Sequence, residues 1–542
     1  MSDPVEYDLI LRSGTLYDGS GDPPVKGDLA IQGQSIAALG DLGAAKGRQE
    51  MDVAGLAVTP GFINMLSWST ESLIVDGRSQ SEIRQGVTLE VMGESESWGP
   101  LSDVMKAEFV ERQGDIQYPV EWTTLGEYLD YLARRGVATN VSSFVGTATL
   151  RVHELGYADR RATPAELERM RGLVRQAMRE GAMGISSALI YAPDCFYHTD
   201  ELIELAKVAA EYDGMYISHL RSEGNAFLEA LDELITVARE ANIRAEVYHL
   251  KAMGQMNWHK MDAALDKINA ARAQGLAITA DMYTYIAAGT GLDATMPRWV
   301  QEGGHKAWVA RLKDPAIRER LRHEMTTPTN EWENVFLMAG APDKLILTGL
   351  RSERLKPLTG QTLAQVMAQR GTGAADTMMD LVVEDDSRVG IVYFVMTEDN
   401  LRKQIRQPWV SLDSDAPSMA PEGVFLKSGT HPRAYGTFAR FLARYVRDEQ
   451  VIPLEDAVRR LTRLPADNLK LRRRGRLAAG YAADLAVFDP ALVQDHATFA
   501  QPHQYSTGMA HVFVNGTQVL RDGEHTGALP GQVVRGPGYG KG

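Results

Sequence analysis

Two histidines, His219 and His249, stand at the ends of consecutive apolar runs, 30 residues apart. This spacing is about the length of one strand–helix unit, so both imidazoles are expected at the same edge of a parallel sheet. Two imidazoles at neighbouring strand ends can bind one zinc ion and leave room for a carboxylate and a water. A lone histidine is more often structural, but this pair predicts a metal site.

Two aspartates compete for the role of proton carrier beside that metal. Asp415 lies in the sequence LDSDA at the end of another apolar run, and Asp413 lies two positions earlier. A carboxylate there could remove a proton from a metal-bound water and pass it to a leaving nitrogen. Positions i and i+2 of a strand face the same side, so alternation does not separate Asp413 from Asp415. A helix-capping aspartate is the structural alternative.

Glu94 is a candidate for the third metal ligand. It follows an apolar run in VMGESESWGP, where Glu96 is the other acidic group, and a hydrated loop glutamate is the structural alternative. Cys195 is the only cysteine, which excludes intrachain disulfides and a multi-cysteine zinc cage. The remaining ligand types are His, Asp and Glu. The fourth apolar run contains no lysine, so it cannot supply a carboxylated lysine bridging two metals.

Eight short apolar runs alternate with helical patterns and would position these side chains. This alternation is typical of parallel βαβ units, and eight of them predict an α/β fold, a TIM-like (β/α)8 barrel with its active site at the carboxyl ends of the strands. The runs are 59–66, 86–93, 140–146, 182–191, 215–221, 244–251, 277–285 and 409–416.

The spacing between these runs breaks once. About 120 residues separate the seventh run from the eighth, far more than an ordinary connection, which predicts an inserted subdomain or lid at about 290–400. Residues 7–58 alternate apolar and polar positions between turns. The same alternation occurs near the C-terminal end of the sequence, including the glycine-rich tail. We therefore expect 1–58 and 466–542 to form a small β-sandwich around a barrel of residues 59–465.

Composition limits the classes of partner. The formal charge of −14 and the lack of a basic run oppose nucleic-acid binding. No apolar run approaches membrane-spanning length, and the acidic N-terminus differs from a secretion signal, so the expected location is cytoplasmic. The expected partner is a small-molecule amide substrate, with a homo-oligomer left open.

Several spaced motifs carry a resemblance. They are SHLRSEG (218–224), YHLKAMG (248–254), ADMYTY (280–285), SDA (414–416), HPRAYGTFARFLARYVRDE (431–449) and RGRLAAGYAADLAVFDP (474–490). In this order they resemble N-acyl-D-amino-acid deacylases of the metal-dependent amidohydrolase superfamily. The resemblance implies zinc binding by His219 and His249, an acid–base role for Asp415, and a metal-bearing TIM-like barrel with a small β-sandwich.

The same resemblance implies a substrate pocket able to hold a carboxylate. The residues it assigns to this pocket are Lys251, Arg221, Tyr191 and Tyr283. Cationic and phenolic groups are suitable donors to a carboxylate.

The sequence departs from the family pattern at two places. Where the superfamily's first strand ends in His-x-His, this chain has Leu66 and Trp68, and where the deacylases have a cysteine after the second strand it has Ser95, a poor ligand. Without the His-x-His pair, one of the superfamily's two metal positions has lost its ligands. We therefore predict a single zinc ion held by His219, His249 and Glu94, with water in the open position.

Trp68 and Leu66 also bring apolar surface to the predicted pocket. Together with Met92, Trp98 and Met419 near other strand ends, they favour a bulky hydrophobic or aromatic substrate. The leading prediction is a metal-dependent hydrolase of N-acyl amino acids or related amides.

Other functions remain open at this stage. The same site could hydrolyse esters, lactones or carbamates, and a non-catalytic amidohydrolase-like binding protein is the alternative from another class. A metal-independent enzyme using Ser95, Ser97 or Ser414 is disfavoured, because none of them has the glycine elbow of such nucleophiles.

Overall fold

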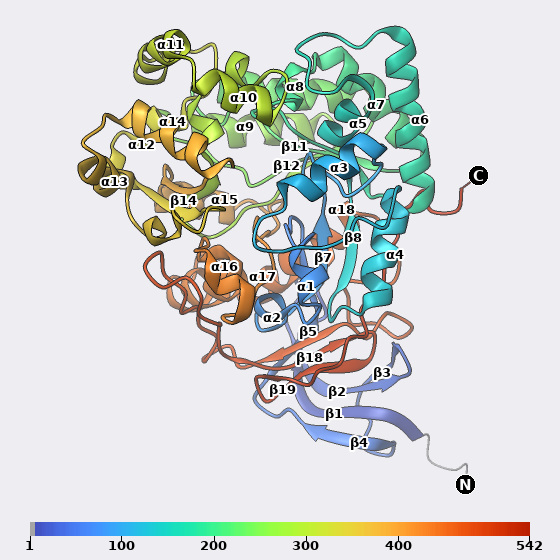
Figure 1. Ribbon diagram of the computed structural model, residues 1–542. Coiled ribbons are helices and arrows are strands. Elements are labelled where there is room, and N and C mark those ends of the chain that lie inside the picture. Colours follow the sequence, from blue (N-terminus) through green and yellow to red (C-terminus); the bar gives the residue numbers. More distant parts are fainter. Residues whose placement is uncertain (1–5, 542) are drawn as a thin grey trace.

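The computed structural model describes residues 6–541. Residues 1–5 and 542, the outermost parts of the two predicted terminal segments, lie outside this range. The fold is mixed α/β, with parallel strands enclosed by helices, a segment inserted late in the chain, and a separate sheet at the end that holds the N-terminus (Figure 1).

The parallel strands coincide with seven of the eight predicted runs. They are β6 (Phe62–Asn64), β7 (Val87–Met92), β8 (Asn140–Ser143), β9 (Val145–Gly146), β10 (Gly184–Ala188), β11 (Met215–His219), β12 (Arg244–Val247) and β13 (Ile278–Ala280). Nearly all their residues are buried, as expected for parallel strands covered on both faces. Pairing runs in parallel from β6 through β7 to β8, and from β9 to β13.

The eighth run, residues 409–416, forms isolated bridges instead of a regular strand. Val410 pairs in parallel with Ala280, the last residue of β13, and Ala416 pairs in parallel with Ser67, which follows β6. The amide N–H of Asp415 donates to the carbonyl of Leu66 at 3.0 Å. This segment therefore connects the last parallel strand to the first, the pairing order of a TIM-barrel type of fold.

Helices follow the parallel strands and cover their outer side (Figure 1). α6 (Pro164–Glu180) illustrates the local signals: Thr163 and Glu166 form a capping box, Pro164 occupies the first turn, and Gly181 ends the helix in the left-handed conformation. The other helices of this layer are α1 (Ser72–Val75), α2 (Gln80–Ile83), α3 (Asp103–Arg112), α4 (Leu125–Arg135), α5 (Thr147–Leu155), α7 (Thr199–Glu211), α8 (Phe227–Glu240), α9 (Lys260–Ala273), α15 (Glu398–Ile405), α16 (Arg433–Arg440), α17 (Leu454–Leu461) and α18 (Arg463–Asn468).

The long connection between the seventh and eighth runs has its own sheet and helices. Its three antiparallel strands lie in the order β14 (Ala287–Gly291), β16 (Gly390–Phe394), β15 (Leu345–Gly349). The helices between them are α10 (His305–Leu312), α11 (Pro315–Thr326), α12 (Val335–Ala339), α13 (Leu363–Arg370) and α14 (Ala374–Asp385). We call residues 287–394 the insert.

Strands from both ends of the chain share one nine-stranded sheet. From the N-terminal side come β1 (Glu6–Leu16), β2 (Val25–Gln32), β3 (Ser35–Gly40), β4 (Lys46–Asp52) and β5 (Ala57–Pro60), and from the C-terminal side β17 (Leu485–Phe488), β18 (Met509–Val514), β19 (Thr517–Arg521) and β20 (Glu524–His525). The antiparallel pairing of β5 with β17 joins the two groups. The run 59–66 is thus divided, with its start in this sheet and its end in β6.

The glycine-rich tail does not extend that sheet, contrary to the sequence expectation. The N–H of Val141 donates to Gln532 at 3.0 Å, and the N–H of Val534 donates to Val141 at 2.9 Å. The tail therefore runs back along the parallel strands towards α6, where Gly536 donates to Gly181. Within residues 6–541, no helix combines the length and apolarity needed to cross a membrane.

Candidate active site

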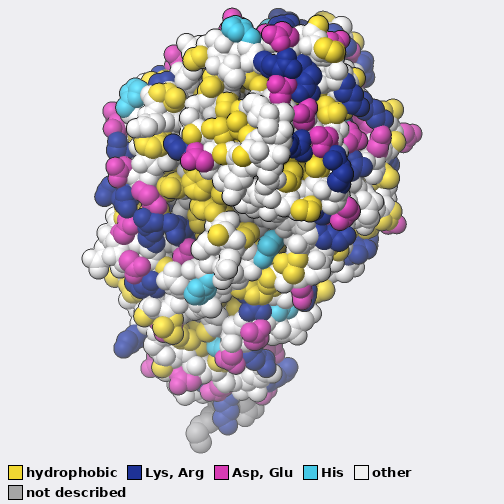
Figure 2. Space-filling view, turned by 60° about the vertical axis from the view of Figure 1, so that its left-hand side comes forward, with side chains coloured by type: hydrophobic (Ala, Val, Ile, Leu, Met, Phe, Trp, Pro, Cys, Tyr) yellow, Lys and Arg dark blue, Asp and Glu magenta, His cyan; other side chains and the backbone are white. Residues whose placement is uncertain are grey.

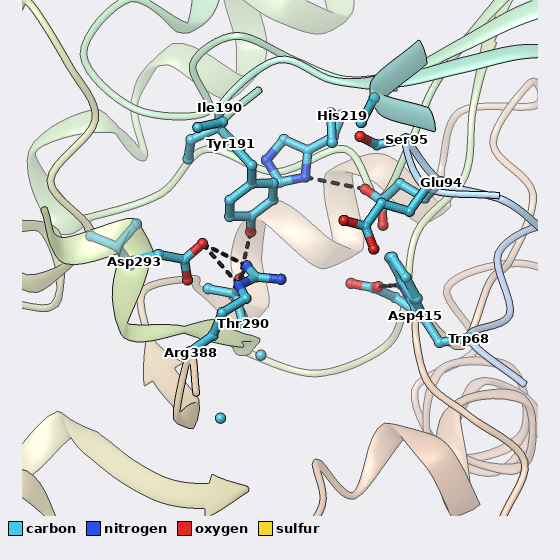
Figure 3. Close-up of a pocket in the computed structure, with 18 of the residues that line it drawn as sticks. Trp68, Glu94, Ser95, Ile190, Tyr191, His219, Thr290, Asp293, Arg388 and Asp415 are labelled. Carbon is cyan, nitrogen blue, oxygen red and sulfur yellow. Dashed lines mark hydrogen bonds and ion pairs between the residues drawn. The ribbon is translucent and has the colours of Figure 1, made fainter. Parts of the chain in front are cut away.

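A cavity of about 620 Å³ lies at the carboxyl ends of the parallel strands and is bordered on its far side by the insert. Its inner wall holds the predicted histidines and carboxylates, and its outer wall holds charged residues of the insert (Figure 3). On the face shown in Figure 2, Lys and Arg side chains are intermixed with Asp and Glu side chains. The cavity, and not a charged surface patch, is the feature that gathers chemical groups.

Glu94, His219 and His249 meet at the inner end of the cavity. Oε1 of Glu94 lies 3.3 Å from Nδ1 of His219 and 3.0 Å from Nε2 of His249. Within residues 6–541 this is the one group of His, Cys, Asp and Glu side chains whose ligand atoms all lie within 4.8 Å of one another. All three side chains are buried. The donor set of two imidazoles and a carboxylate matches that of catalytic zinc sites.

The turn after β7 determines which carboxylate reaches the histidines. Gly93 has a φ of 97°, and a Cβ there would lie 2.4 Å from the carbonyl oxygen of Phe144, so only glycine fits. Glu94 then faces the histidines, whereas the hydroxyl of Ser95 donates to Asp194 at 2.8 Å. Glu96 lines the cavity but belongs to no such cluster.

The charges around the cluster favour a bound cation. Burial would raise the pKa of Glu94, but the charge of His249 and hydrogen bonds from both histidines hold it below its usual range. Burial and Lys251 oppose protonation of His249, yet Glu94 and Glu223 raise its pKa to about 10. Nε2 of His219 has no hydrogen-bond partner. Two buried carboxylates thus stabilise positive charge at His249, while burial lowers the pKa of His219. A metal ion would bring positive charge to the same carboxylates.

Glu223 lies behind both histidines, and the sequence reasoning did not identify it. Its carboxylate is 3.4 Å from Nε2 of His219 and 3.2 Å from Nδ1 of His249. Lys251 donates to it at 2.7 Å. The available signal was the spacing in HLRSEG, which puts this acid four residues after His219.

Asp415 is held at the cavity wall by a hydrogen bond and an ion pair. The indole Nε1–H of Trp68 donates to Oδ1 at 3.1 Å (Figure 3). Nη1 of Arg433 lies 2.7 Å from Oδ2. Asp415 has a φ of 45°, which turns it away from the path of Asp413. Burial raises the pKa of the Asp415 carboxyl, and Arg433 opposes this shift.

Asp413, the competitor at the sequence level, does not line the cavity. It is fully buried, and burial together with Asp415 raises its pKa to about 7. Its N–H donates to Met282 within the strand layer. The geometry therefore separates two residues that alternation could not.

Arg433 is a second cavity residue that the sequence reasoning missed as an individual. It is 4% exposed; its Nη1 atom forms the ion pair with Asp415, and its Nε atom has no hydrogen-bond partner. Its guanidinium lies 4.5 Å from the ring centroid of Tyr283. The motif HPRAYG contains it, but nothing in the spacing indicated that it points to Asp415.

Three of the four residues expected to hold a carboxylate line the cavity: Lys251, Tyr191 and Tyr283. Arg221 does not, and this part of the expectation is wrong. Its guanidinium pairs with Glu233 at 2.8 Å and donates to the carbonyls of Cys195 and Tyr197. It borders a smaller neighbouring cavity instead. The chain turns away after Leu220, so the side chain two residues beyond His219 no longer faces the strand ends.

Of the apolar residues expected at the pocket, one lines the cavity and the others lie in the core. Trp68 lines the cavity, but Leu66 is fully buried in a core cluster below it. Met92, Trp98 and Met419 are core residues and do not line the cavity. The apolar wall is formed by other side chains, among them Ile190, Pro193, Met253, Trp308 and Val335.

The insert provides the outer end of the cavity. Arg388 pairs with Asp293 at 2.9 Å, and its guanidinium lies 5.1 Å from the ring centroid of Tyr191. The hydroxyl of Tyr191 donates to Thr290 at 2.7 Å (Figure 3). This chain of contacts connects the wall of the parallel strands to the insert.

Comparisons with known proteins give consistent similarities. A family model described as the amidohydrolase family matches residues 49–520. A D-aminoacylase from Alcaligenes xylosoxydans xylosoxydans is 32% identical, over 98% of this chain and 98% of its own length.

Two solved structures resemble the whole chain. The N-acyl-D-glutamate deacylase from Bordetella bronchiseptica, complexed with zinc and a phosphonate mimic of the tetrahedral intermediate, is 29% identical with a TM-score of 0.80, covering 98% of this chain and 100% of its own. A D-aminoacylase described for one-metal activation and second-metal attenuation of a binuclear centre is 30% identical with a TM-score of 0.81, at the same coverage.

Proposed function

Since the chain belongs to the amidohydrolase family, as its motifs predicted, we propose that it is a metal-dependent deacylase that hydrolyses the amide bond of N-acyl-D-amino acids. One observation carries the proposal: a His–His–Glu cluster and a carboxylate held by Trp68 and Arg433 share one cavity with the buried cation Lys251. The D configuration is taken from three relatives that match the chain over nearly its whole length and whose names specify it.

Glu94, His219 and His249 are the proposed ligands of one zinc ion. The fit rests on their donor types, on their close approach, and on the burial of all three side chains. When bound, the ion would act as a Lewis acid towards the scissile carbonyl and towards water. Leu66 and Trp68 supply no ligand at a second position, which is why one ion is proposed.

Asp415 is the proposed general base and acid. Trp68 and Arg433 each engage one of its oxygens, so the carboxylate keeps a fixed orientation towards the cavity. It would take a proton from the attacking water and return it to the leaving nitrogen.

Lys251 and Arg433 are the proposed anchors of the substrate carboxylate. Both are buried cationic side chains at the cavity wall, and Nε of Arg433 has no hydrogen-bond partner. The ring of Tyr283 lies near both cations, with the Lys251 ammonium 5.7 Å from its centroid, and it would fill the space beside the bound carboxylate. Tyr191 and Trp68 would line the path of the acyl and side-chain groups.

The volume and lining of the cavity favour a large, largely apolar substituent. A volume of about 620 Å³ lies within the range usual for small-molecule sites. Trp68, Ile190 and Trp308 offer apolar surface along it. A bulky hydrophobic or aromatic N-acyl group or side chain is therefore the proposed substrate feature.

We also propose a finer division of the fold. The circuit of parallel pairings supports a closed (β/α)8 barrel of residues 59–465, interrupted by a subdomain at about 290–400. Residues 1–58 and the part of 466–542 that precedes the glycine-rich tail would form a β-sandwich, since the side chains of Leu11, Val58 and Leu485 pack in one separate core.

The direct test is hydrolysis of paired D and L N-acetyl amino acids with small and aromatic side chains. We expect activity on the D forms, loss after treatment with a chelator, and recovery with zinc. Zinc content near one ion per chain is the expected stoichiometry. Activity that survives complete removal of metal would contradict the proposal.

A further inference from the structure

The carboxylate of Glu223 divides its two oxygens between the two histidines of the cluster. Oε2 lies 3.4 Å from Nε2 of His219, and Oε1 lies 3.2 Å from Nδ1 of His249. The opposite nitrogens, Nδ1 of His219 and Nε2 of His249, are those that approach Glu94. One buried carboxylate thus faces the rear nitrogen of each imidazole.

The position of Glu223 is itself rigid. The residue is 2% exposed, its N–H donates to Glu333 at 2.8 Å, and its carbonyl accepts from Met253 at 2.7 Å. Both backbone groups are therefore engaged, and Lys251 holds the carboxylate at 2.7 Å. A side chain fixed in this way can impose an orientation on its neighbours.

We propose that Glu223 is a positioning residue for both histidines, selecting the tautomers that direct Nδ1 of His219 and Nε2 of His249 towards the metal. The inference rests on the proposed metal site. A neutral imidazole that ligates through one nitrogen carries its proton on the other, and a carboxylate behind that N–H fixes the ring. Here one carboxylate lies 3.2–3.4 Å from the rear nitrogen of both rings, so its loss would loosen two ligands at once.

A second consequence concerns Lys251. Its ammonium lies 2.6 Å from Nδ1 of His249 as well as 2.7 Å from Glu223. A nitrogen that carries a proton cannot accept one, so in the ligating tautomer Lys251 cannot donate to His249. It then donates to Glu223 alone and has its other N–H groups directed to the cavity, where the substrate carboxylate is proposed to bind.

The test compares Glu223→Gln with Glu233→Gln by zinc affinity. Glutamine keeps the volume, but its amide has a single oxygen acceptor and can serve only one imidazole. The outer-shell effect on metal affinity is typically about 10–100-fold, so competition with a chromophoric chelator should show a loss of that size in Glu223→Gln. Glu233→Gln removes a carboxylate that is also mostly buried and ion-paired, on α8, and should leave the zinc affinity unchanged.

Two further measurements separate positioning from folding. Glu223→Asp keeps a carboxylate and should recover part of the zinc affinity. If the glutamine variant does not fold, the zinc affinity of Glu223→Asp tests the inference in its place. Cobalt substitution should give an altered visible spectrum in Glu223→Gln, because the ligand geometry changes. Unchanged zinc affinity and cobalt spectrum in a folded Glu223→Gln protein would overturn the inference.

The failure of the proposed metal site would look different. His219→Ala and His249→Ala would then leave zinc binding intact in the same assay. If those variants lose zinc while Glu223→Gln keeps it, the site stands and the positioning role is rejected.

Discussion

The two ends of the cavity are built on different principles. At the inner end, Glu94, His219 and His249 stand directly at strand ends and are at most 5% exposed. At the outer end, charged groups of the insert form partly open pairs, with the Arg388 side chain 54% exposed against Asp293. An ion pair in a low-dielectric, desolvated place interacts much more strongly than an exposed one.

This difference indicates that the two ends of the cavity have different functions. Groups that hold a metal or move a proton need fixed positions, which strand ends and buried hydrogen bonds provide. Groups that distinguish substrates tolerate variation, which loops and inserted segments provide. We therefore expect changes at the inner end to abolish catalysis and changes at the outer end to alter substrate preference.

The largest expected effect is that of His249→Ala. Removal of one of three ligands should abolish zinc retention and reduce activity to background, since even outer-shell changes cost about 10–100-fold in metal affinity. Zinc content and kcat/KM measure the effect. His259→Ala, at the exposed start of α9, is the matched control. If His249→Ala kept its zinc and full activity, His249 would not be a required metal ligand, and the inner end would not be the catalytic end.

Asp415→Asn should rank second. The amide cannot accept the proton, so kcat should fall by about 10²–10⁴-fold while zinc content stays normal. Asp413→Asn should cost much less, because Asp413 does not line the cavity. Equal losses in both variants would mean that the two carboxylates act as a unit.

Trp68→Phe should have an intermediate effect. It keeps an aromatic ring but removes the N–H that holds Oδ1 of Asp415, a charge-assisted hydrogen bond whose loss corresponds to about a 10-fold lower kcat. The matched control is Trp258→Phe, whose indole donates to the carbonyl of Val395 away from the cavity. If Trp68→Phe changes only KM, the indole contacts substrate and does not position Asp415.

The smallest expected effect is that of Arg388→Ala at the outer end. Loss of a half-exposed ion pair should change KM by only about 2–5-fold, leave kcat nearly unchanged, and shift the ranking of N-acyl substrates. Arg354→Ala, which removes an exposed pair with Glu384 elsewhere in the insert, is the control. A collapse of kcat in Arg388→Ala would show that the insert takes part in the chemistry.

The sequence was informative wherever periodicity and residue type suffice. Seven of the eight predicted runs appear as strands, because apolar runs between turn residues leave the backbone few alternatives. The 30-residue spacing correctly predicted that His219 and His249 lie at the same edge of the parallel strands, because it matches the length of one strand–helix unit. The family resemblance, carried by motifs in a fixed order, is confirmed by the family match.

The sequence did not predict side-chain directions beyond the strand ends, because the regular alternation of side chains between the two faces of a strand ends there. Arg221 was assigned to the pocket but turns to Glu233, and Leu66 points into the core. Glu223 was missed although its spacing from His219 was visible, and Arg433 was missed because no local pattern indicates where the first side chain of α16 will point.

The sequence by itself determined the parallel strands, the supply of ligand types, and the absence of a first-strand His-x-His. Only the tertiary structure decided which carboxylate meets which nitrogen and which donor holds Asp415. The physical reason is distance along the chain: Trp68 and Asp415 are 347 positions apart, and Glu94 and His249 are 155 apart. Contacts of a few ångströms between such segments depend on the packing of the strands that lie between them.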